Sequence, residues 1–213
     1  MTRPNHAAGT HPFWDRTAPK YARRPIGDPG AYREKLAFVA ALLRPQDRVL
    51  EIGCGTGSTA LHLAPNVAHY TAADGARAMI AIAKGKLGAN APTNVTFLQA
   101  EADARIPGAP FDAICAFSLL HLVDDLPSVL EAVRSQLAPG GLFLSKSVCT
   151  KEAGWPIRLL IPTLTALRLA PRVTPLSRAD LIRHVTDAGL TVEVTTHFGS
   201  NRMSPFIVAR NAA

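Results

Sequence analysis

Residues 49–57 read Val49-Leu50-Glu51-Ile52-Gly53-Cys54-Gly55-Thr56-Gly57. An apolar run that contains one acid leads into three alternating glycines, and a helical pattern begins at Ser58. Glycine has no Cβ, so it allows the backbone to turn sharply and to lie against a ligand. A strand that runs into such a turn and then into a helix predicts a loop that binds a nucleotide-type cofactor.

Short apolar runs alternate with helical patterns on both sides of this loop, which is typical of a parallel sheet with crossover helices. The expected strands are Arg48–Ile52, Ala68–Ala73, Val95–Gln99, Ala113–Phe117 and Leu142–Val148. The expected helices are Tyr32–Leu43, Ser58–Leu63, Ala76–Leu87, Leu126–Leu137 and Ser177–Ala188. Two further runs, Leu190–Thr196 and Arg202–Ala209, have the spacing of a hairpin, so we expect one antiparallel strand near the C-terminal edge of the sheet.

The composition favours one globular domain. The chain has 213 residues, of which 47% are hydrophobic and 18% charged, and this balance excludes a disordered protein. No leader-like segment and no apolar run of membrane-spanning length is evident, so we expect a cytoplasmic protein. The three cysteines have neither metal-binding nor redox spacing, and we expect free thiols and no metal site.

The net charge of +7 is unevenly distributed along the chain. Residues 1–48 carry +5, residues 49–150 carry −2, and residues 151–213 carry +4. The expected cofactor-binding core is therefore slightly acidic, and the basic residues lie in the segments that flank it. Either a solvated basic surface or a patch that attracts anions explains this distribution.

Asp74 follows Gly53 by 21 residues, at the end of the second expected strand. A carboxylate at that position can accept hydrogen bonds from ribose hydroxyls. Residues 55–60 also fit the loose G-x-G-x-x-G/A pattern of dinucleotide-binding proteins, so an NAD-dependent oxidoreductase is one alternative. That pattern alone is weak, and the chain has no room for a separate substrate domain.

Five ordered motifs instead resemble the class I S-adenosylmethionine-dependent methyltransferases. They are the Glu-x-Gly-x-Gly-x-Gly loop at 51–57, Asp74 before a helix, Glu101-Ala102 after the third strand, Phe111-Asp112 with Phe117-Ser118 around the fourth, and Pro139-Gly140-Gly141 before the fifth. The resemblance implies a Rossmann-like, seven-stranded, mostly parallel sheet with helices on both faces and an antiparallel C-terminal edge hairpin. A non-catalytic module that binds S-adenosylmethionine remains a further alternative.

The resemblance also implies a set of cofactor contacts to S-adenosylmethionine, and hence to the product S-adenosylhomocysteine. The implied residues are Tyr21, Glu51, Gly53, Cys54, Gly55, Asp74, Gly75, Glu101, Ala102 and Ser118. The glycines would approach the methionine part, Asp74 the ribose, and Glu101 the adenine. Asp103 is the alternative to Glu101 as the contact for the adenine amino group.

His121 is the histidine that this interpretation places at the mouth of the site. An imidazole can act as a base near neutral pH, so His121 is the candidate catalytic residue. A packing role, in which the ring stabilises the loop after the fourth strand, is the alternative.

Residues 13–22 resemble the aromatic entry segment of the ubiquinone and menaquinone methyltransferases. Tyr21 would close over the cofactor and Trp14 would line the acceptor cavity, unless both only anchor the terminus. Residues 155–170 are strongly apolar for a connection, with Trp155 and His121 as candidate substrate contacts. This segment could be a lid, a peripheral membrane contact or the interface of a homodimer.

These expectations divide one domain into four parts: N-terminal cap helices at 1–45, the cofactor-binding core at 46–150, the apolar insert at 151–176, and a helix with a hairpin at 177–213. The expected reaction is methyl transfer to oxygen, carbon or nitrogen of a small, apolar or lipid-like acceptor. A nucleic-acid acceptor is not expected, because the loop after the fourth strand lacks a Pro-Pro-aromatic turn and no nucleophilic cysteine is placed for carbon methylation of RNA.

Overall fold

The computed structural model describes residues 11–200 and 202–212, except for the side chains of residues 157–159. Its helices are α1 (His11–Arg23), α2 (Pro29–Leu42), α3 (Ser58–Leu63), α4 (Arg77–Gly85), α5 (Leu126–Gln136), α6 (Trp155–Ala166) and α7 (Arg178–Asp187), with 3₁₀ turns η1 (Ala64–Asn66) and η2 (Thr150–Glu152). Its strands are β1 (Arg48–Ile52), β2 (His69–Asp74), β3 (Val95–Gln99), β4 (Phe111–Phe117), β5 (Leu137–Lys146), β6 (Leu190–Thr196) and β7 (Phe206–Asn211).

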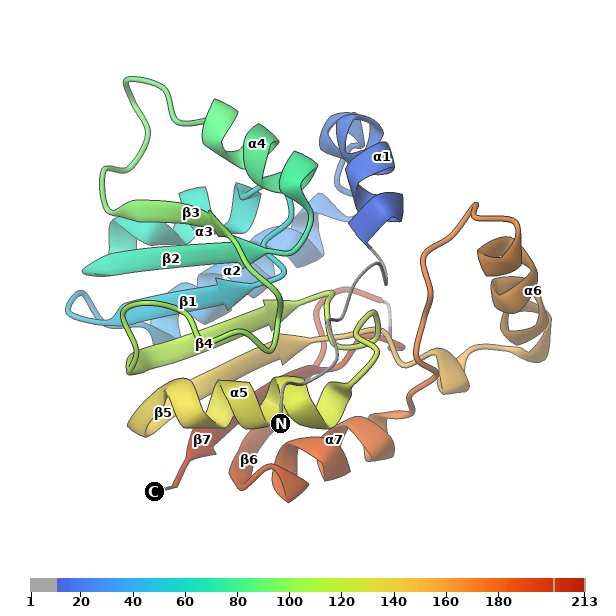
Figure 1. The fold of residues 1–213 in the computed structure, drawn as a ribbon. Helices are drawn as coiled ribbons and strands as arrows, with labels where there is room; N and C mark the ends of the chain where they lie inside the picture. Colours follow the sequence, from blue (N-terminus) through green and yellow to red (C-terminus); the bar gives the residue numbers. More distant parts are fainter. Residues whose placement is uncertain (1–10, 201, 213) are drawn as a thin grey trace, which may run out of the picture.

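The seven strands form one sheet in the order β3-β2-β1-β4-β5-β7-β6. Strands β1 to β5 are parallel, and β7 is antiparallel to both of its neighbours. The predicted fold class is therefore confirmed, including the antiparallel hairpin. The arrows of the parallel strands end on the side where α1 and α6 lie (Figure 1).

Two hydrophobic clusters cover the two faces of the sheet. Helices α2, α3 and α4 contribute to one cluster, and α5 and α7 contribute to the other. The strands supply alternate residues to each face: in β1, Val49 belongs to the first cluster and Leu50 to the second. A strand that is buried on both faces reads as a nearly continuous apolar run, which is why β1 was evident in the sequence.

Helices α1 and α6 lie outside these two layers (Figure 1). Helix α1 packs against the start of α4 through Ala18, Ala76 and Met79. Helix α6, which follows β5 and precedes α7 in the chain, protrudes at the right of Figure 1. Both helices lie beyond the carboxyl ends of the parallel strands, where open α/β sheets bind their ligands. The four-part division of the chain stays a prediction.

Candidate active site

The glycine loop forms the turn between β1 and α3. Gly53, Gly55 and Gly57 all have positive φ angles, between 54° and 74°, which side chains rarely tolerate. A Cβ at Gly57 would lie 2.6 Å from the Phe97 ring, so close packing also requires glycine there. A Cβ at Gly55 would have only the Tyr21 ring near it, at 3.9 Å, so the Gly55 backbone is open to the cavity described below.

Asp74 at the end of β2 fixes this loop. Its Oδ2 accepts the N–H of Gly55 at 2.8 Å, and its Oδ1 accepts the N–H of Ala76 at 2.8 Å. Burial raises the pKa of Asp74, while the two backbone hydrogen bonds oppose that shift. One carboxylate therefore joins the ends of β1 and β2.

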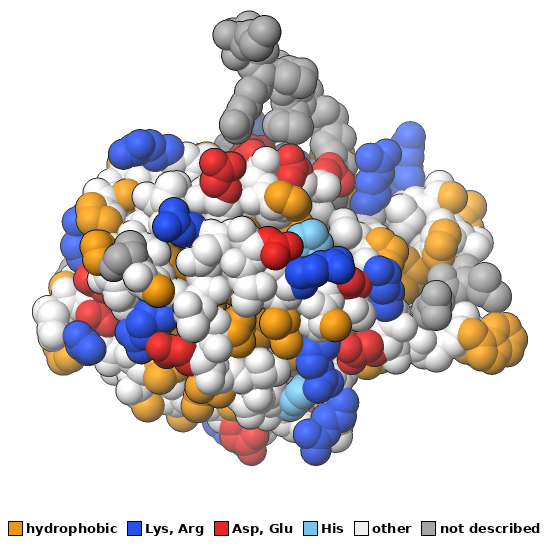
Figure 2. Space-filling model, turned by 90° about the horizontal axis from the view of Figure 1, so that it is seen from below, with side chains coloured by type: hydrophobic (Ala, Val, Ile, Leu, Met, Phe, Trp, Pro, Cys, Tyr) orange, Lys and Arg blue, Asp and Glu red, His pale blue; other side chains and the backbone are white. Residues whose placement is uncertain are grey.

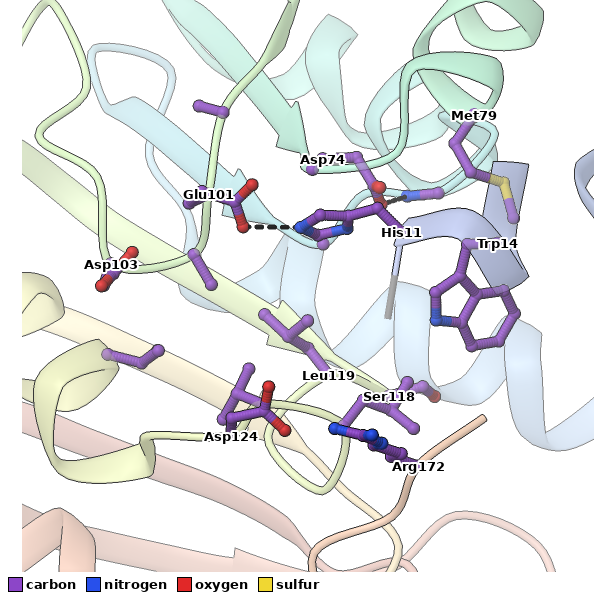
Figure 3. A pocket seen from close by; sticks show the side chains of 18 of the residues that line it. His11, Trp14, Asp74, Met79, Glu101, Asp103, Ser118, Leu119, Asp124 and Arg172 are labelled. Atoms are coloured by element: carbon purple, nitrogen blue, oxygen red, sulfur yellow. Dashed lines mark hydrogen bonds and ion pairs between the residues drawn. The ribbon is translucent and has the colours of Figure 1, made fainter. Parts of the chain in front are cut away.

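A cavity of about 380 Å³ opens beside the loop. Its lining includes most of the predicted site residues, namely Trp14, Tyr21, Gly53, Gly55, Asp74, Gly75, Glu101, Ala102 and Ser118. Figure 3 shows Asp74, Glu101, Ser118 and Trp14 arranged around this space. Residues from the N-terminal helix and from the ends of β1 to β4 thus meet at one place. What each of them binds stays a prediction.

Two predicted contacts, Glu51 and Cys54, are buried and do not line this cavity. Glu51 accepts a hydrogen bond from the Tyr70 hydroxyl at 3.2 Å. Burial raises the pKa of Glu51 to about 7, and the charge of the buried Lys35 in α2 opposes the shift. The acid of the motif therefore interacts with β2 and α2, and its contact with the cofactor stays a prediction.

Lys35 was not recognised from the sequence. Its side chain is only 5% exposed, and its Nζ lies 4.2 Å from the centroid of the Phe117 ring and 4.8 Å from that of Tyr32. Burial lowers the pKa of Lys35 to about 8, and the attraction of Glu51 opposes this shift. Phe117 lines the cavity, so the buried charges lie directly behind its wall.

His11 is a second residue that the sequence did not reveal. Its Nε2 lies 2.7 Å from Oε2 of Glu101, across 90 positions of sequence (Figure 3). Nearby, the N–H of Ala78 donates to Asp15 Oδ1 at 2.8 Å. These contacts attach α1 to the segment after β3 and to α4, so the N-terminal helix forms one wall of the cavity.

His121 is buried, with 8% of its surface exposed, and it is not among the residues that line the cavity. Its Nδ1 accepts the N–H of Val148 at 3.4 Å, and its carbonyl oxygen accepts the N–H of Thr174 at 2.8 Å. Burial lowers the pKa of His121 to about 4, so the ring is neutral at pH 7. Through these two hydrogen bonds, His121 links the loop after β4 to the segments that contain Val148 and Thr174.

A second cavity, of about 1010 Å³, lies between α6 and residues 172–175. It is lined by Asp124, Thr150, Lys151, Trp155, Ile161, Pro162, Thr165, Ala166, Arg172, Val173, Thr174 and Pro175. Asp124 and Arg172 line the first cavity as well. The predicted contact Trp155 belongs to this second cavity and is 73% exposed.

Exposed apolar side chains gather on the protruding end of the molecule. Trp155, Leu160, Leu167 and Leu169 are each more than half exposed, and Figure 2 shows hydrophobic side chains over this end, at the right. No helix within residues 11–200 and 202–212 is long and apolar enough to span a bilayer.

The sheet order, the glycine loop and the cavity at its carboxyl edge define a nucleotide-cofactor enzyme of the Rossmann-like type. Residues 23–194 match the "Methyltransferase domain" family, and the chain therefore belongs to that family, as a class I S-adenosylmethionine-dependent methyltransferase. Its cofactor is S-adenosylmethionine. The NAD-dependent alternative is thereby set aside.

Among curated proteins, the chain is 27% identical over 197 residues to a ubiquinone biosynthesis O-methyltransferase of Xanthomonas axonopodis pv. citri. The aligned region covers 88% of this chain and 79% of that protein. It is 32% identical over 157 residues to the protein of the same name from Xylella fastidiosa, and the aligned region covers 68% of this chain and 61% of that protein. Among solved structures, magnesium protoporphyrin IX methyltransferase from Synechocystis PCC 6803, with bound SAH, superposes with a TM-score of 0.71 at 18% sequence identity. The superposition covers 94% of this chain and 97% of that chain, and it shows that the two proteins share a fold.

Proposed function

We propose that this chain transfers the methyl group of S-adenosylmethionine to a small molecule with an apolar body. The observation that carries the proposal is the pair of adjoining cavities, one beside the glycine loop and a larger, mainly apolar one under α6. The names of the curated relatives are consistent with a small acceptor.

The first cavity suits the cofactor because backbone, and not side chains, faces it at the glycine loop. Gly55 leaves the space open, since the one atom within 4 Å of a Cβ there belongs to the Tyr21 ring, at 3.9 Å. We assign the ribose to Asp74, the adenine to Glu101 and Ala102, and the methionine part to Gly53 and the backbone of Ser118. The bound cofactor supplies an activated methyl group on a sulfonium.

The protein's own contribution is alignment and exclusion of water, because methyl transfer is an in-line displacement. Trp14 and Tyr21 pack edge to face, with ring centroids 5.9 Å apart, and cover the cavity from the α1 side. Ser118, which has a positive φ of 57°, directs the chain after β4 toward the cavity. A strained backbone at such a position is common in functional sites.

We assign His121 a positioning role, since its ring faces Val148 and not the cavity. We propose that helix α6 covers the acceptor cavity.

The exposed side chains of α6 and of the residues after it, together with basic residues such as Arg168, favour a peripheral contact with a membrane or with a second copy of the chain. Sedimentation with anionic and neutral vesicles, and the oligomeric state in solution, test these two contacts.

Titration calorimetry tests the core of the proposal. Native protein should bind S-adenosylhomocysteine with one site per chain and should give no heat with NAD. Methyl transfer from labelled S-adenosylmethionine should then appear in a small-molecule extract and not in RNA. Labelling of RNA alone would contradict the proposed acceptor class.

A further inference from the structure

We infer that Asp124 and Arg172 together receive the hydroxyl group of the methyl acceptor, with Asp124 taking its proton and Arg172 holding its oxygen. This inference rests on the proposed function and deepens it, because it names the accepting atom and the residues that select it.

Asp124 and Arg172 come from two segments that meet where the two cavities join. Asp124 lies in the loop between β4 and α5, and Arg172 lies between α6 and α7. Of the residues that the structure describes, these two line both cavities, so they lie where an acceptor in the larger cavity would meet the cofactor. Figure 3 shows both side chains at the same margin of the first cavity, with their charged ends turned toward each other.

Neither charged group has a partner among the described residues. Within residues 11–200 and 202–212, neither side chain makes a hydrogen bond or an ion pair, and the two are not within ion-pair distance of each other. Three of the four other acids that line the first cavity already have partners: Asp74 accepts backbone N–H groups, Glu101 contacts His11, and Asp125 caps α5. Asp103 lies on the opposite side of the cavity in Figure 3.

The chemistry of the two groups specifies what they can bind. A carboxylate only accepts hydrogen bonds and a guanidinium only donates them. A hydroxyl satisfies both groups, because it donates its proton to Asp124 and accepts from Arg172 with one lone pair. Its second lone pair stays free to attack. An amine has a single lone pair, which a bond from Arg172 would occupy.

Methyl transfer to such a hydroxyl is a single displacement. The acceptor oxygen forms a bond to the methyl carbon, the carbon–sulfur bond breaks with its electron pair left on sulfur, and the hydroxyl proton passes to Asp124 and on to water. Arg172 stabilises the charge that develops on the oxygen. This arrangement favours acidic hydroxyls, such as phenols and enols, whose apolar rings fit between Ile161, Ala166 and Val173.

The binding of 4-nitrophenol to protein saturated with S-adenosylhomocysteine tests the inference without turnover, because the phenol and the phenolate differ in absorbance. The pKa of the probe bound to native protein is the reference, because the negative charge of Asp124 raises that pKa and the positive charge of Arg172 lowers it. Arg172→Gln should raise that pKa by about one unit relative to native protein, and Asp124→Asn should lower it by about one unit, because each substitution removes one neighbouring charge. Arg168→Gln, which changes an arginine outside both cavities, should leave it unchanged.

A matched pair of larger residues locates the probe. Ala166→Trp places an indole in the second cavity and should weaken 4-nitrophenol binding at least tenfold, whereas Leu167→Trp, on the exposed side of the chain, should not. Binding of S-adenosylhomocysteine should persist in all variants. Its absence in native protein would refute the proposed function itself. If native protein binds S-adenosylhomocysteine but does not bind 4-nitrophenol, the inference alone is overturned. The same holds if the probe has the same pKa in native, Asp124→Asn and Arg172→Gln proteins.

Discussion

The carboxylate of Asp74, the last residue of β2, accepts the backbone N–H of Gly55 at 2.8 Å and so links β2 to the glycine loop that follows β1. Asp74→Ala should therefore both remove a proposed ribose contact and loosen the loop. We expect S-adenosylhomocysteine affinity to fall about tenfold or more, since hydrogen bonds to charged groups contribute about 1.5–3 kcal/mol. Calorimetry measures this, with Asp187→Asn, at the end of α7, as the control; unchanged affinity would remove Asp74 from the site.

Gly57→Ala should destabilise the fold. The residue has a φ of 74°, and a new Cβ would lie 2.6 Å from the Phe97 ring. Because alanine at position 57 would have to adopt a left-handed backbone and would crowd the Phe97 ring, we expect the free energy of unfolding to fall by about 2–4 kcal/mol. Gly85→Ala is the matched control, because nothing lies within 4 Å of its Cβ position and the backbone is helical. Urea unfolding should show Gly85→Ala unchanged or slightly more stable.

Stability should depend on pH through His121. Its folded pKa of about 4 lies below the ordinary value of 6.5, so the unfolded chain binds the proton more readily. The stabilisation is present above pH 6.5 and is lost as the pH falls toward 4, by about 3 kcal/mol in total. His121→Gln should flatten the unfolding free energy across this window. If native protein and variant show the same slope, the ring is not held neutral by burial.

Lys35 and Glu51 should behave as a coupled pair. Lys35→Met leaves the buried Glu51 carboxylate without its cation, which typically destabilises a fold by about 3–5 kcal/mol. Because the folded pKa of Glu51 would rise further above its unfolded value, stability should fall as the pH rises from about 5 to 8. Adding Glu51→Gln to Lys35→Met should restore much of the loss. Additive effects in this double-mutant cycle would contradict the coupling.

Local sequence pattern was sufficient for much of the fold. The bounds of β1, β3, β6 and α3 are those predicted, because each is a compact apolar or capped segment bounded by turn residues. β7 begins at Phe206 and not at Arg202, since Pro205 has no N–H to donate to a neighbouring strand. β5 begins at Leu137, where the sequence indicated the end of a helix.

Site residues could be predicted only where they belong to a sequence motif. The glycine loop and Asp74 have fixed spacing, and they meet as expected. The contact of His11 with Glu101 joins residues 90 positions apart, and the burial of Lys35 depends on how α2 packs over the sheet. The junction of the two cavities depends on where the chain returns after α6. None of these leaves a periodic or spaced signal in the sequence.

The strand order also bears on how the protein is synthesised. β7 is the latest strand in the chain, yet it lies between β5 and β6, so these two strands cannot be bridged until residues 206–211 have been made. Until then β5 presents an open edge, which in other proteins invites pairing with a neighbouring chain. The half that holds the glycine loop can assemble first, and we expect nascent chains stalled before residue 206 to be the form most prone to aggregate.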